Sequence, residues 1–420
     1  MTTSQQQGER RNRREPGERR GRRAWDRCAR LAGLTAVPGQ IDRFYLTPEH
    51  RAANDLTARW MKESGLHTWL DEAGNVHGST GQRDSRRPRL LIGSHLDTVP
   101  DAGRFDGIAG VMAGIEVAGG EWAANFPFDV EVIGFGDEEG TRFGTALLGS
   151  RAVAGTWDDR WWGLEDENGI SLDRAFAEFG LDPERVGDAS YAAKNVVGYL
   201  EVHIEQGPSL DRARIPLGVV SSIASARRFE IEIIGEPRHS GGTPFDERHD
   251  ALLGAAEAVL AVERFSIEHS VIGTVGRMEV EPGAVNVIPG RAVFSVDLRA
   301  HHDHQRDDII EQFRELVTEV ADRRGLRATM KQLHEAPAVY CADRLKEAVR
   351  AGIADVQDET PPELFSPAGH DAMAIDAITE VGMIFMRNPD GISHHPAEYV
   401  SPDDLGAGIA ALAHAVQSLA

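Results

Sequence analysis

Apolar segments that end abruptly in polar residues are the feature that most constrains the fold of this chain. One runs from Arg89 to Asp97, the next from Phe128 to Phe135, and a third from Gly198 to Ile204. Runs of this length and composition are typical of buried strands, and the intervening helical patterns indicate alternating strands and helices. Open α/β sheets place their ligands at the carboxyl ends of their strands. The sequence therefore predicts an α/β domain with functional residues at those ends.

The segment from Thr47 to Leu66 carries a clear helix signal. Thr47 supplies an N-cap, Pro48 occupies the first helical position, and Gly65 closes the helix. Small residues over 111–117 predict another helix, which follows the first of the three strands. We therefore expect a mixed β-sheet flanked by helices.

The pattern changes near Gly218. Strands and helices are then expected in the order strand, helix, strand, strand, helix and strand, over residues 229–234, 250–262, 273–280, 291–299, 305–323 and 328–332. This order predicts a compact α+β sandwich of the ferredoxin-like type. Because residues of metal-ligand type resume afterwards, we expect residues 218–333 to be inserted into a catalytic domain formed by residues 25–217 and 334–420.

Composition argues against several classes of function. The formal charge of −22 over 420 residues disfavours binding to a nucleic-acid backbone. Cys28 and Cys341 are too few for a disulfide framework or a thiolate metal site, which favours the reducing cytoplasm. No apolar run approaches the ~20 residues of a membrane span. We expect a cytoplasmic protein with neither nucleic acid nor membrane as a partner.

An arginine-rich segment begins the chain. Eight arginines crowd residues 1–24, and the segment lacks the apolar stretch that a secretory signal requires. We expect a disordered basic extension outside the fold. A tail that touches nucleic acid or a membrane is the alternative.

Side chains that bind metal ions recur at the predicted strand ends. His95 and Asp97 lie two residues apart on a strand, so their side chains share one face. Asp106 follows in a turn, where the two oxygens of its carboxylate are able to bridge two metal ions. Imidazole and carboxylate ligands suit Zn²⁺ or Mn²⁺. Each signal alone is weak, because a single buried histidine is more often a core residue than a ligand.

The adjacent Glu138 and Glu139 strengthen the metal interpretation. Two carboxylates at one strand end repel each other unless cations lie nearby. One glutamate is able to hold a metal ion while the other moves protons. His203, on an apolar strand, and His394, in a later loop, add nitrogen ligands. Together these residues predict a hydrolase with two metal ions.

Longer motifs surround the candidate ligands. They cover residues 93–107, 137–143, 203–207, 283–290 and 369–372. Together they resemble the hydantoinase/carbamoylase branch of the aminoacylase/carboxypeptidase-like metallohydrolases, over the chain from about Leu31 to its end. Residues 45–54 and 65–78 are most similar to allantoate amidohydrolases. N-carbamoyl-L-amino acid hydrolases and β-ureidopropionases share most of these motifs.

The resemblance implies roles for individual residues. One metal ion would be held by His95, Asp106 and His203, and the second by Asp106, Glu139 and His394. Motif alignment favours His394 over His395, and Asp97 would support His95. Glu138 would be the general base. Substrate contacts would come from Gln206, Asn286, Arg299 and His370.

The inserted domain would act as a lid and dimerisation domain. In similar proteins a histidine at the position of His239 reaches the partner subunit's site and polarises the substrate carbonyl, which implies a homodimer. Gly242 replaces a threonine beside this histidine. Pro367 replaces a glycine ahead of His370.

The activity implied by the resemblance is hydrolysis of a ureido C–N bond in a small substrate that carries a carboxylate. Allantoate is the first candidate, and its hydrolysis would release ammonia and CO₂ and leave a ureidoglycine-type product. An N-carbamoyl-L-amino acid is the second candidate. An aminoacylase or peptidase of the same clan and an inactive metal-binding homologue are more remote. The cofactors would be two divalent ions, Mn²⁺ or Zn²⁺, with Co²⁺ and Ni²⁺ as further candidates.

Overall fold

The chain divides into two compact units in a computed structural model that describes residues 3–120 and 126–420, with side chains described from residue 17 onward. The first unit contains Met1–Ser221, Tyr340–Leu364 and Gly369–Ala420. The second contains Ser222–Val339 and Phe365–Ala368. Its main segment begins four residues after the predicted start at residue 218 and ends six residues after the predicted end at residue 333. The reason is that strands continue through both predicted boundaries.

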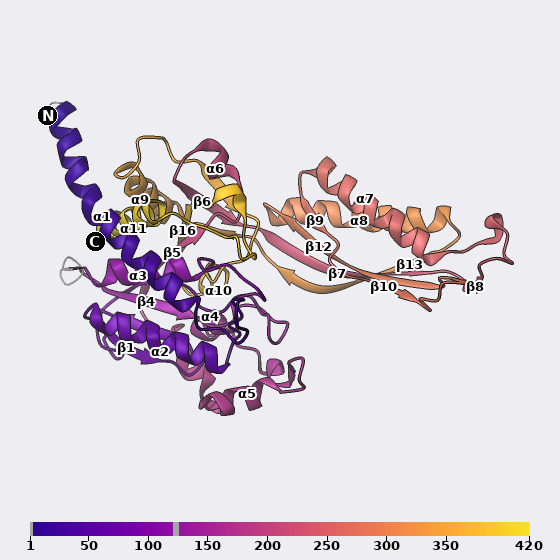
Figure 1. The fold of residues 1–420 in the computed structure, drawn as a ribbon, viewed down its shortest axis with the longest axis horizontal. Coiled ribbons are helices and arrows are strands. Elements are labelled where there is room, and N and C mark those ends of the chain that lie inside the picture. Colours follow the sequence, from indigo (N-terminus) through magenta and orange to yellow (C-terminus); the bar gives the residue numbers. More distant parts are fainter. Residues whose placement is uncertain (1–2, 121–125) are drawn as a thin grey trace. The chain divides into compact units, whose positions relative to one another are not determined.

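A nine-stranded mixed sheet forms the centre of the first unit (Figure 1). Its order is β1 (His67–Leu70), β2 (Val76–Ser79), β4 (Asp129–Phe135), β3 (Arg89–His95), β5 (Val196–Ile204), β16 (Val381–Met386), β6 (Leu217–Ile223) and β14 (Val339–Tyr340), with β15 (Glu363–Ser366) paired to β6. β4, β3, β5 and β16 are mutually parallel. The three strands predicted from apolar runs are therefore neighbours, and their polar carboxyl ends lie together.

The two faces of β5 meet different surroundings. Leu200, Val202 and Ile204 join the apolar core formed with α3 (Ile108–Ala118), α9 (Asp343–Ala354) and α11 (Pro402–Ser418). Glu201 and His203 alternate with them and therefore face the other side. There the first residue of α10 (Ala372–Ile375) donates its backbone N–H to the Glu201 carboxylate at 3.2 Å. His203, a candidate functional residue, thus lies on the face opposite the apolar helical layer.

The first unit also contains further helices. They are α2 (Pro48–Glu63), α4 (Leu148–Ala154), α5 (Leu172–Phe179) and α6 (Ser209–Ala213). The N-cap, Pro48 and the ending at Gly65 follow the sequence prediction, because the Thr47 side chain accepts the His50 N–H and Gly65 has a φ of 85°. No helix in the described residues has the length and apolar character needed to cross a membrane.

The prediction of a disordered extension over residues 1–24 is wrong from Thr3 onward, because α1 spans Thr3–Leu31. Gly17, Gly21, Ala24, Cys28 and Leu31 are buried at helical spacing. A side chain at Gly21 would overlap the backbone of α11. The arginines between these small residues hide the helical pattern in the sequence. Met1 and Thr2 lie outside the described residues.

Two of the α1 arginines have a specific partner on α3. The Glu116 side chain is buried, and it accepts hydrogen bonds from Arg23 and, at 3.0 Å, from Arg27. Burying an unpaired carboxylate is costly, so these arginines stabilise the α1–α3 contact. The basic segment is therefore part of the fold on its carboxyl side.

The second unit is a five-stranded antiparallel sheet with two helices. Its strands are β7 (Ser225–Ile234), β9 (Ile272–Thr274), β10 (Met278–Glu281), β12 (Arg291–Ala300) and β13 (Arg327–Ala336). α7 (Ala251–His269) and α8 (Asp303–Arg323) pack on it through one apolar core. A ribbon of β8 (Arg238–His239) and β11 (Val287–Ile288) is paired separately. The predicted fold class, a mixed α/β sheet plus a separate α+β unit, is confirmed.

His50 on α2 is expected to make stability depend on pH. Its ring is buried, stacks on Phe179, and accepts the Leu46 N–H at Nδ1 (3.1 Å). Burial, and next the charge of Arg43, lower the pKa of His50 to about 3. An unfolded histidine has a pKa of about 6.5, so the unfolded chain binds the extra proton between these values. The stability from neutral His50 is present above pH 6.5 and is lost as the pH falls towards 3.

The measurement is urea unfolding at several pH values between 7 and 5, followed by tryptophan fluorescence. All seven tryptophans precede residue 163, in the segment assigned to the first unit. We expect the unfolding free energy to fall more steeply with decreasing pH in the parent than in His50→Gln. The two slopes should differ by up to about 1.4 kcal/mol per pH unit. His67→Gln, at an exposed histidine, is the control. Equal slopes for the parent and His50→Gln would contradict the prediction.

Candidate dinuclear metal centre

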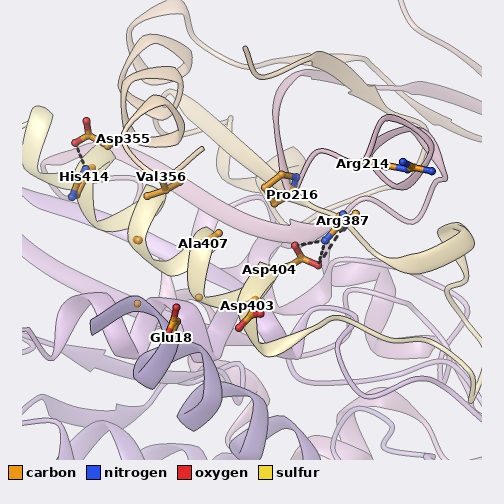
Figure 2. A pocket seen from close by; sticks show the side chains of 13 residues that line it. Glu18, Arg214, Pro216, Asp355, Val356, Arg387, Asp403, Asp404, Ala407 and His414 are labelled. Atoms are coloured by element: carbon orange, nitrogen blue, oxygen red, sulfur yellow. Dashed lines mark hydrogen bonds and ion pairs between the residues drawn. The ribbon is translucent and has the colours of Figure 1, made fainter. Parts of the chain in front are cut away.

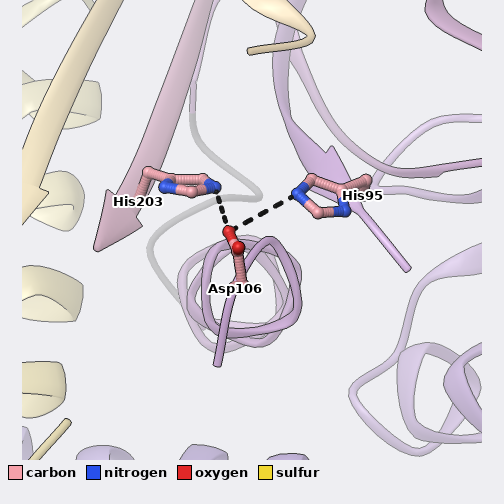
Figure 3. A group of neighbouring side chains, drawn as sticks. All are labelled: His95, Asp106 and His203. Carbon is pink, nitrogen blue, oxygen red and sulfur yellow. Dashed lines mark ion pairs between the residues drawn. The ribbon is translucent and has the colours of Figure 1, made fainter. Parts of the chain in front are cut away.

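One oxygen of the Asp106 carboxylate lies between two buried imidazoles (Figure 3). Asp106 Oδ1 is 3.1 Å from His203 Nε2 and 3.8 Å from His95 Nε2. His95 ends β3, His203 lies near the end of β5, and Asp106 occupies the turn before α3. The parallel register of β3 and β5 therefore brings together residues that are more than 100 positions apart.

Hydrogen bonds at the other ring nitrogen orient both imidazoles. His95 Nδ1 lies 3.1 Å from the Asp97 carbonyl oxygen, and His203 Nδ1 lies 2.9 Å from that of Ile204. A nitrogen that donates to a carbonyl leaves the opposite Nε2 with a lone pair. Both Nε2 atoms face the buried Oδ1 of the Asp106 carboxylate. Positive charge among the three side chains, from a proton on an imidazole or from a metal ion, would balance the buried carboxylate.

The pKa of His203 reflects the same demand for positive charge. Burial opposes the charged ring, but the hydrogen bond to Asp106 raises the pKa of His203 to about 9. A divalent ion would take the place of this proton.

A second set of ligand atoms uses the other Asp106 oxygen. His394 Nε2 lies 3.1 Å from Asp106 Oδ2 and 3.5 Å from Glu139 Oε1. His394 has a φ of 54°, in the left-handed region, within the loop before α11. The neighbouring His395 instead accepts the Ala397 N–H at Nδ1. Among the described residues, Asp106, Glu139 and His394 thus form a second possible metal site that shares one carboxylate with the first.

Asp97 holds the backbone of the paired glutamates. Its two oxygens accept the N–H groups of Glu138 (3.1 Å) and Glu139 (3.2 Å). Burial, and next the charge of Glu139, raise the pKa of Glu138 well above its usual range. Burial, and next Asp106, raise the pKa of Glu139 to about 8. Bound cations would offset this crowding of negative charge.

Glu201 was not singled out in the sequence, although it lies two residues before His203 and therefore shares its face of β5. It is fully buried and accepts hydrogen bonds from Ser94 and Tyr199, each at 3.0 Å. The ring of His370 lies edge-on to His203 with centroids 4.4 Å apart. Glu201, His203 and His370 also form a group whose ligand atoms lie close together. The period of two along the strand is the signal that would have identified Glu201.

The side chain of Gln206 lies against the candidate ligands. Its Nε2 donates to Asp106 Oδ2 at 3.0 Å and to Ser393 Oγ at 3.2 Å, while its backbone N–H donates to Asn388 Oδ1. A contact with substrate stays a prediction. The observed hydrogen bonds show that Gln206 orients the shared carboxylate.

Three predicted site residues lie in the second unit, and two of them are close together. His239 pairs with Val287 across the β8–β11 ribbon, and the Asn286 carbonyl accepts the Ser240 N–H at 3.0 Å. Gly242 donates its N–H to His239 Nδ1 at 3.0 Å. The His239 ring therefore carries its proton on Nε2, where it is available as a donor.

Arg299 of β12 already has protein partners within the second unit. Its guanidinium binds both oxygens of Asp297, at 2.9 and 3.2 Å, and donates to the Pro367 carbonyl at 2.7 Å. A substrate carboxylate would therefore share this guanidinium with Asp297. The predicted substrate contact stays a prediction.

A cavity of about 340 Å³ opens elsewhere in the first unit (Figure 2). Its lining includes Glu18 of α1, Arg214, the ion pair of Arg387 with Asp404, and His414 of α11. None of the predicted site residues lines it. The candidate metal centre is therefore a separate place.

Two candidate ligand sets that share a carboxylate, near the carboxyl ends of parallel strands, have the arrangement of a dinuclear metal hydrolase. Residues 91–418 match the family model described as peptidase family M20/M25/M40. The chain belongs to this family, and within it to the hydantoinase/carbamoylase branch of amidohydrolases.

Similar proteins support this assignment. Allantoate deiminase 1 of Glycine max is 37% identical, over 92% of this chain and 87% of its own. The N-carbamoyl-L-amino acid amidohydrolase of Geobacillus stearothermophilus is 37% identical, over 95% and 98%. A hydantoinase/carbamoylase family amidase from Burkholderia multivorans has a TM-score of 0.85 at 33% identity, over 95% and 97%. The structure of AtUAH with glyoxylate has a TM-score of 0.82 at 29% identity, over 95% and 98%.

Proposed function

We propose that the protein hydrolyses a ureido C–N bond of a small carboxylate and that its substrate is allantoate. With one water molecule, allantoate would yield a ureidoglycine-type product, ammonia and CO₂. The observation that carries the proposal is the pair of ligand sets sharing Asp106 beside Glu138, in a chain similar to an allantoate deiminase. The small carboxylate glyoxylate in a similar structure supports a substrate of this size and charge.

N-carbamoyl-L-amino acids are the second candidate substrates. A bacterial amidohydrolase named for them matches this chain at the same identity as the plant allantoate deiminase. Both substrate classes present a ureido carbonyl and a carboxylate, so one arrangement of residues is able to serve either. The substituent next to the ureido nitrogen would decide between them.

Glu138 is the residue we assign to proton transfer. Its side chain is buried, and its carboxylate lies near the His95 imidazole and the Glu139 carboxylate. It is not part of the two sets that share Asp106. A carboxylate in this position would accept a proton from the attacking water and return it to the departing nitrogen. His239 is the residue we assign to oxyanion stabilisation. Its Nε2–H would donate a hydrogen bond to the carbonyl oxygen on which negative charge develops.

His95, Asp106 and His203 would hold one divalent ion, and Asp106, Glu139 and His394 the other. Bound there, the two ions would polarise the ureido carbonyl and lower the pKa of water. Mixed imidazole and carboxylate ligands accept Mn²⁺ or Zn²⁺, and also Co²⁺ or Ni²⁺. We propose Mn²⁺ or Zn²⁺ as the native ions.

A substrate panel tests the proposed reaction. Protein loaded with Mn²⁺ or with Zn²⁺ is given allantoate, an N-carbamoyl-L-amino acid, β-ureidopropionate and an N-acetyl amino acid. Ammonia or acetate release is followed. We expect the highest kcat/KM for allantoate, by about tenfold or more, because a site that hydrogen-bonds a second ureido group penalises substrates that lack it. A higher kcat/KM for the N-carbamoyl amino acid would make that compound, and not allantoate, the substrate. Hydrolysis of the N-acetyl compound alone would refute ureido hydrolysis.

A homodimer is proposed from one face of α7. Leu253, Leu260 and Ile267 recur every seven residues, and 50%, 56% and 76% of their respective surfaces are exposed. A stripe of this kind on a helix favours contact with the same stripe of a second copy. Light scattering should give twice the chain mass of 45.8 kDa, and Leu260→Lys should shift the protein towards the monomer. A monomeric parent would contradict the proposal.

A further inference from the structure

Glu398 is a buried carboxylate beside the candidate metal centre that no sequence motif singled out. Only 3% of its surface is exposed. Its Oε1 accepts the backbone N–H groups of Phe105 (2.8 Å) and Asp106 (3.0 Å). Its Oε2 lies 3.0 Å from Ser393 Oγ. One carboxylate thus contacts two segments that are nearly 300 residues apart.

The turn before α3 is shaped around this carboxylate. A Cβ atom at Gly103 would overlap the carboxyl group of Glu398. The N–H groups of Phe105 and Asp106 point to the same oxygen from the other end of the turn. Charge-assisted hydrogen bonds of this kind are roughly twice as strong as neutral ones. Glu398 therefore holds the backbone from which the shared Asp106 carboxylate projects.

Ser393 extends the contact to the second ligand set. It directly precedes His394, and its Oγ lies 3.0 Å both from Glu398 Oε2 and from Asp106 Oδ2. A hydroxyl has one proton and donates to one acceptor at a time. When the Asp106 oxygens are used by metal ions, Glu398 is the acceptor that stays available. The loop carrying His394 is then still tied to the turn carrying Asp106.

We infer that Glu398 is a positioning residue that sets the distance between Asp106 and His394 and thereby the affinity of the second metal site. Residues that orient ligands in this way typically change metal affinity by about 10- to 100-fold when they are removed. The inference rests on the ligand assignment proposed above and not on the identity of the substrate.

The test is a titration of chelator-stripped protein with Mn²⁺, in which free Mn²⁺ is measured by electron paramagnetic resonance. We expect the parent to bind two ions per chain. Glu398→Ala should weaken the second ion by about 100-fold and the first by less, because Asp106 belongs to both ligand sets but His394 only to the second. Glu398→Gln keeps an oxygen for the two N–H groups and should weaken the second ion by about 10-fold. Ser393→Ala should weaken only the second ion, because it cuts the tie to His394.

Asp71→Asn is the matched control. Asp71 is also 3% exposed, and its Oδ1 accepts two backbone N–H groups, of Ala73 (2.9 Å) and Asn75 (2.8 Å), in the same unit. The Asp71→Asn substitution should lower the urea midpoint of unfolding while leaving both Mn²⁺ affinities unchanged. Folded Glu398→Gln and Ser393→Ala proteins that bind two ions with parental affinity would overturn the inference, even if Glu398→Ala fails to fold. A parent that binds two ions but hydrolyses no ureido compound would refute the proposed substrate alone.

Discussion

Replacing Glu138 with glutamine is expected to lower kcat by about 10²- to 10⁴-fold, the range typical for loss of a general acid–base. The amide has nearly the same shape as the buried carboxylate, so packing should change little. It cannot accept the proton of the attacking water. Steady-state kinetics on the best substrate of the panel provides the measurement. Metal content should stay at the parental value, because Glu138 is outside the two ligand sets that share Asp106.

Glu139→Gln is the matched control for this prediction. The two glutamates are adjacent and both have raised pKa values because of burial. Only Glu139 lies near His394, at 3.5 Å. We therefore expect Glu139→Gln to lose metal content as well as activity. Full activity in Glu138→Gln, or loss of metal from it alone, would contradict the division of roles.

Replacing Glu131 with glutamine is expected to produce the largest loss of stability. Glu131 is fully buried on β4, pairs with His77 (2.8 Å) and Arg89, and accepts the Tyr191 hydroxyl at 2.6 Å. Burial opposes its charge, but His77 and Arg89 hold the pKa of Glu131 below its usual range. Removing one partner of a buried ion pair costs about 3–5 kcal/mol, because the remaining charges stay buried.

Urea unfolding followed by tryptophan fluorescence measures this loss in the first unit. The control is Glu178→Gln, which breaks the exposed pair of Arg174 with Glu178 on α5. An exposed pair four residues apart on a helix contributes about 0.3–0.5 kcal/mol. Equal effects of the two substitutions would show that burial does not determine the cost.

Strand-end residues were predictable because chain order and sheet order agree locally. β3, β4 and β5 are neighbours, so His95, Glu139 and His203 meet at one edge without any long-range information. The inserted unit was predictable from its alternation of strands and helices. Its boundaries differed because β6 and β13 continue past the points where the sequence pattern changes.

Other features depend on contacts that no local pattern records. Glu398 contacts Phe105 and Asp106 across more than 290 residues. The burial of Gly21 depends on α11, at the far end of the chain, and arginines surround it in the sequence. Charge and hydropathy describe such segments as solvent-exposed, whereas the folded chain uses their small residues for close packing.

The distribution of the candidate metal ligands along the chain has a consequence for biosynthesis. His95, Asp106, Glu139 and His203 leave the ribosome early, whereas His394 follows almost 200 residues later. β16, which pairs with β5, is also made late. A nascent chain therefore exposes an incomplete set of chelating groups while the second unit is being translated. The candidate set of His95, Asp106 and His203 is complete early, whereas the set that contains His394 is complete only when synthesis is nearly finished. We therefore expect the second ion to be loaded late in the maturation of this enzyme.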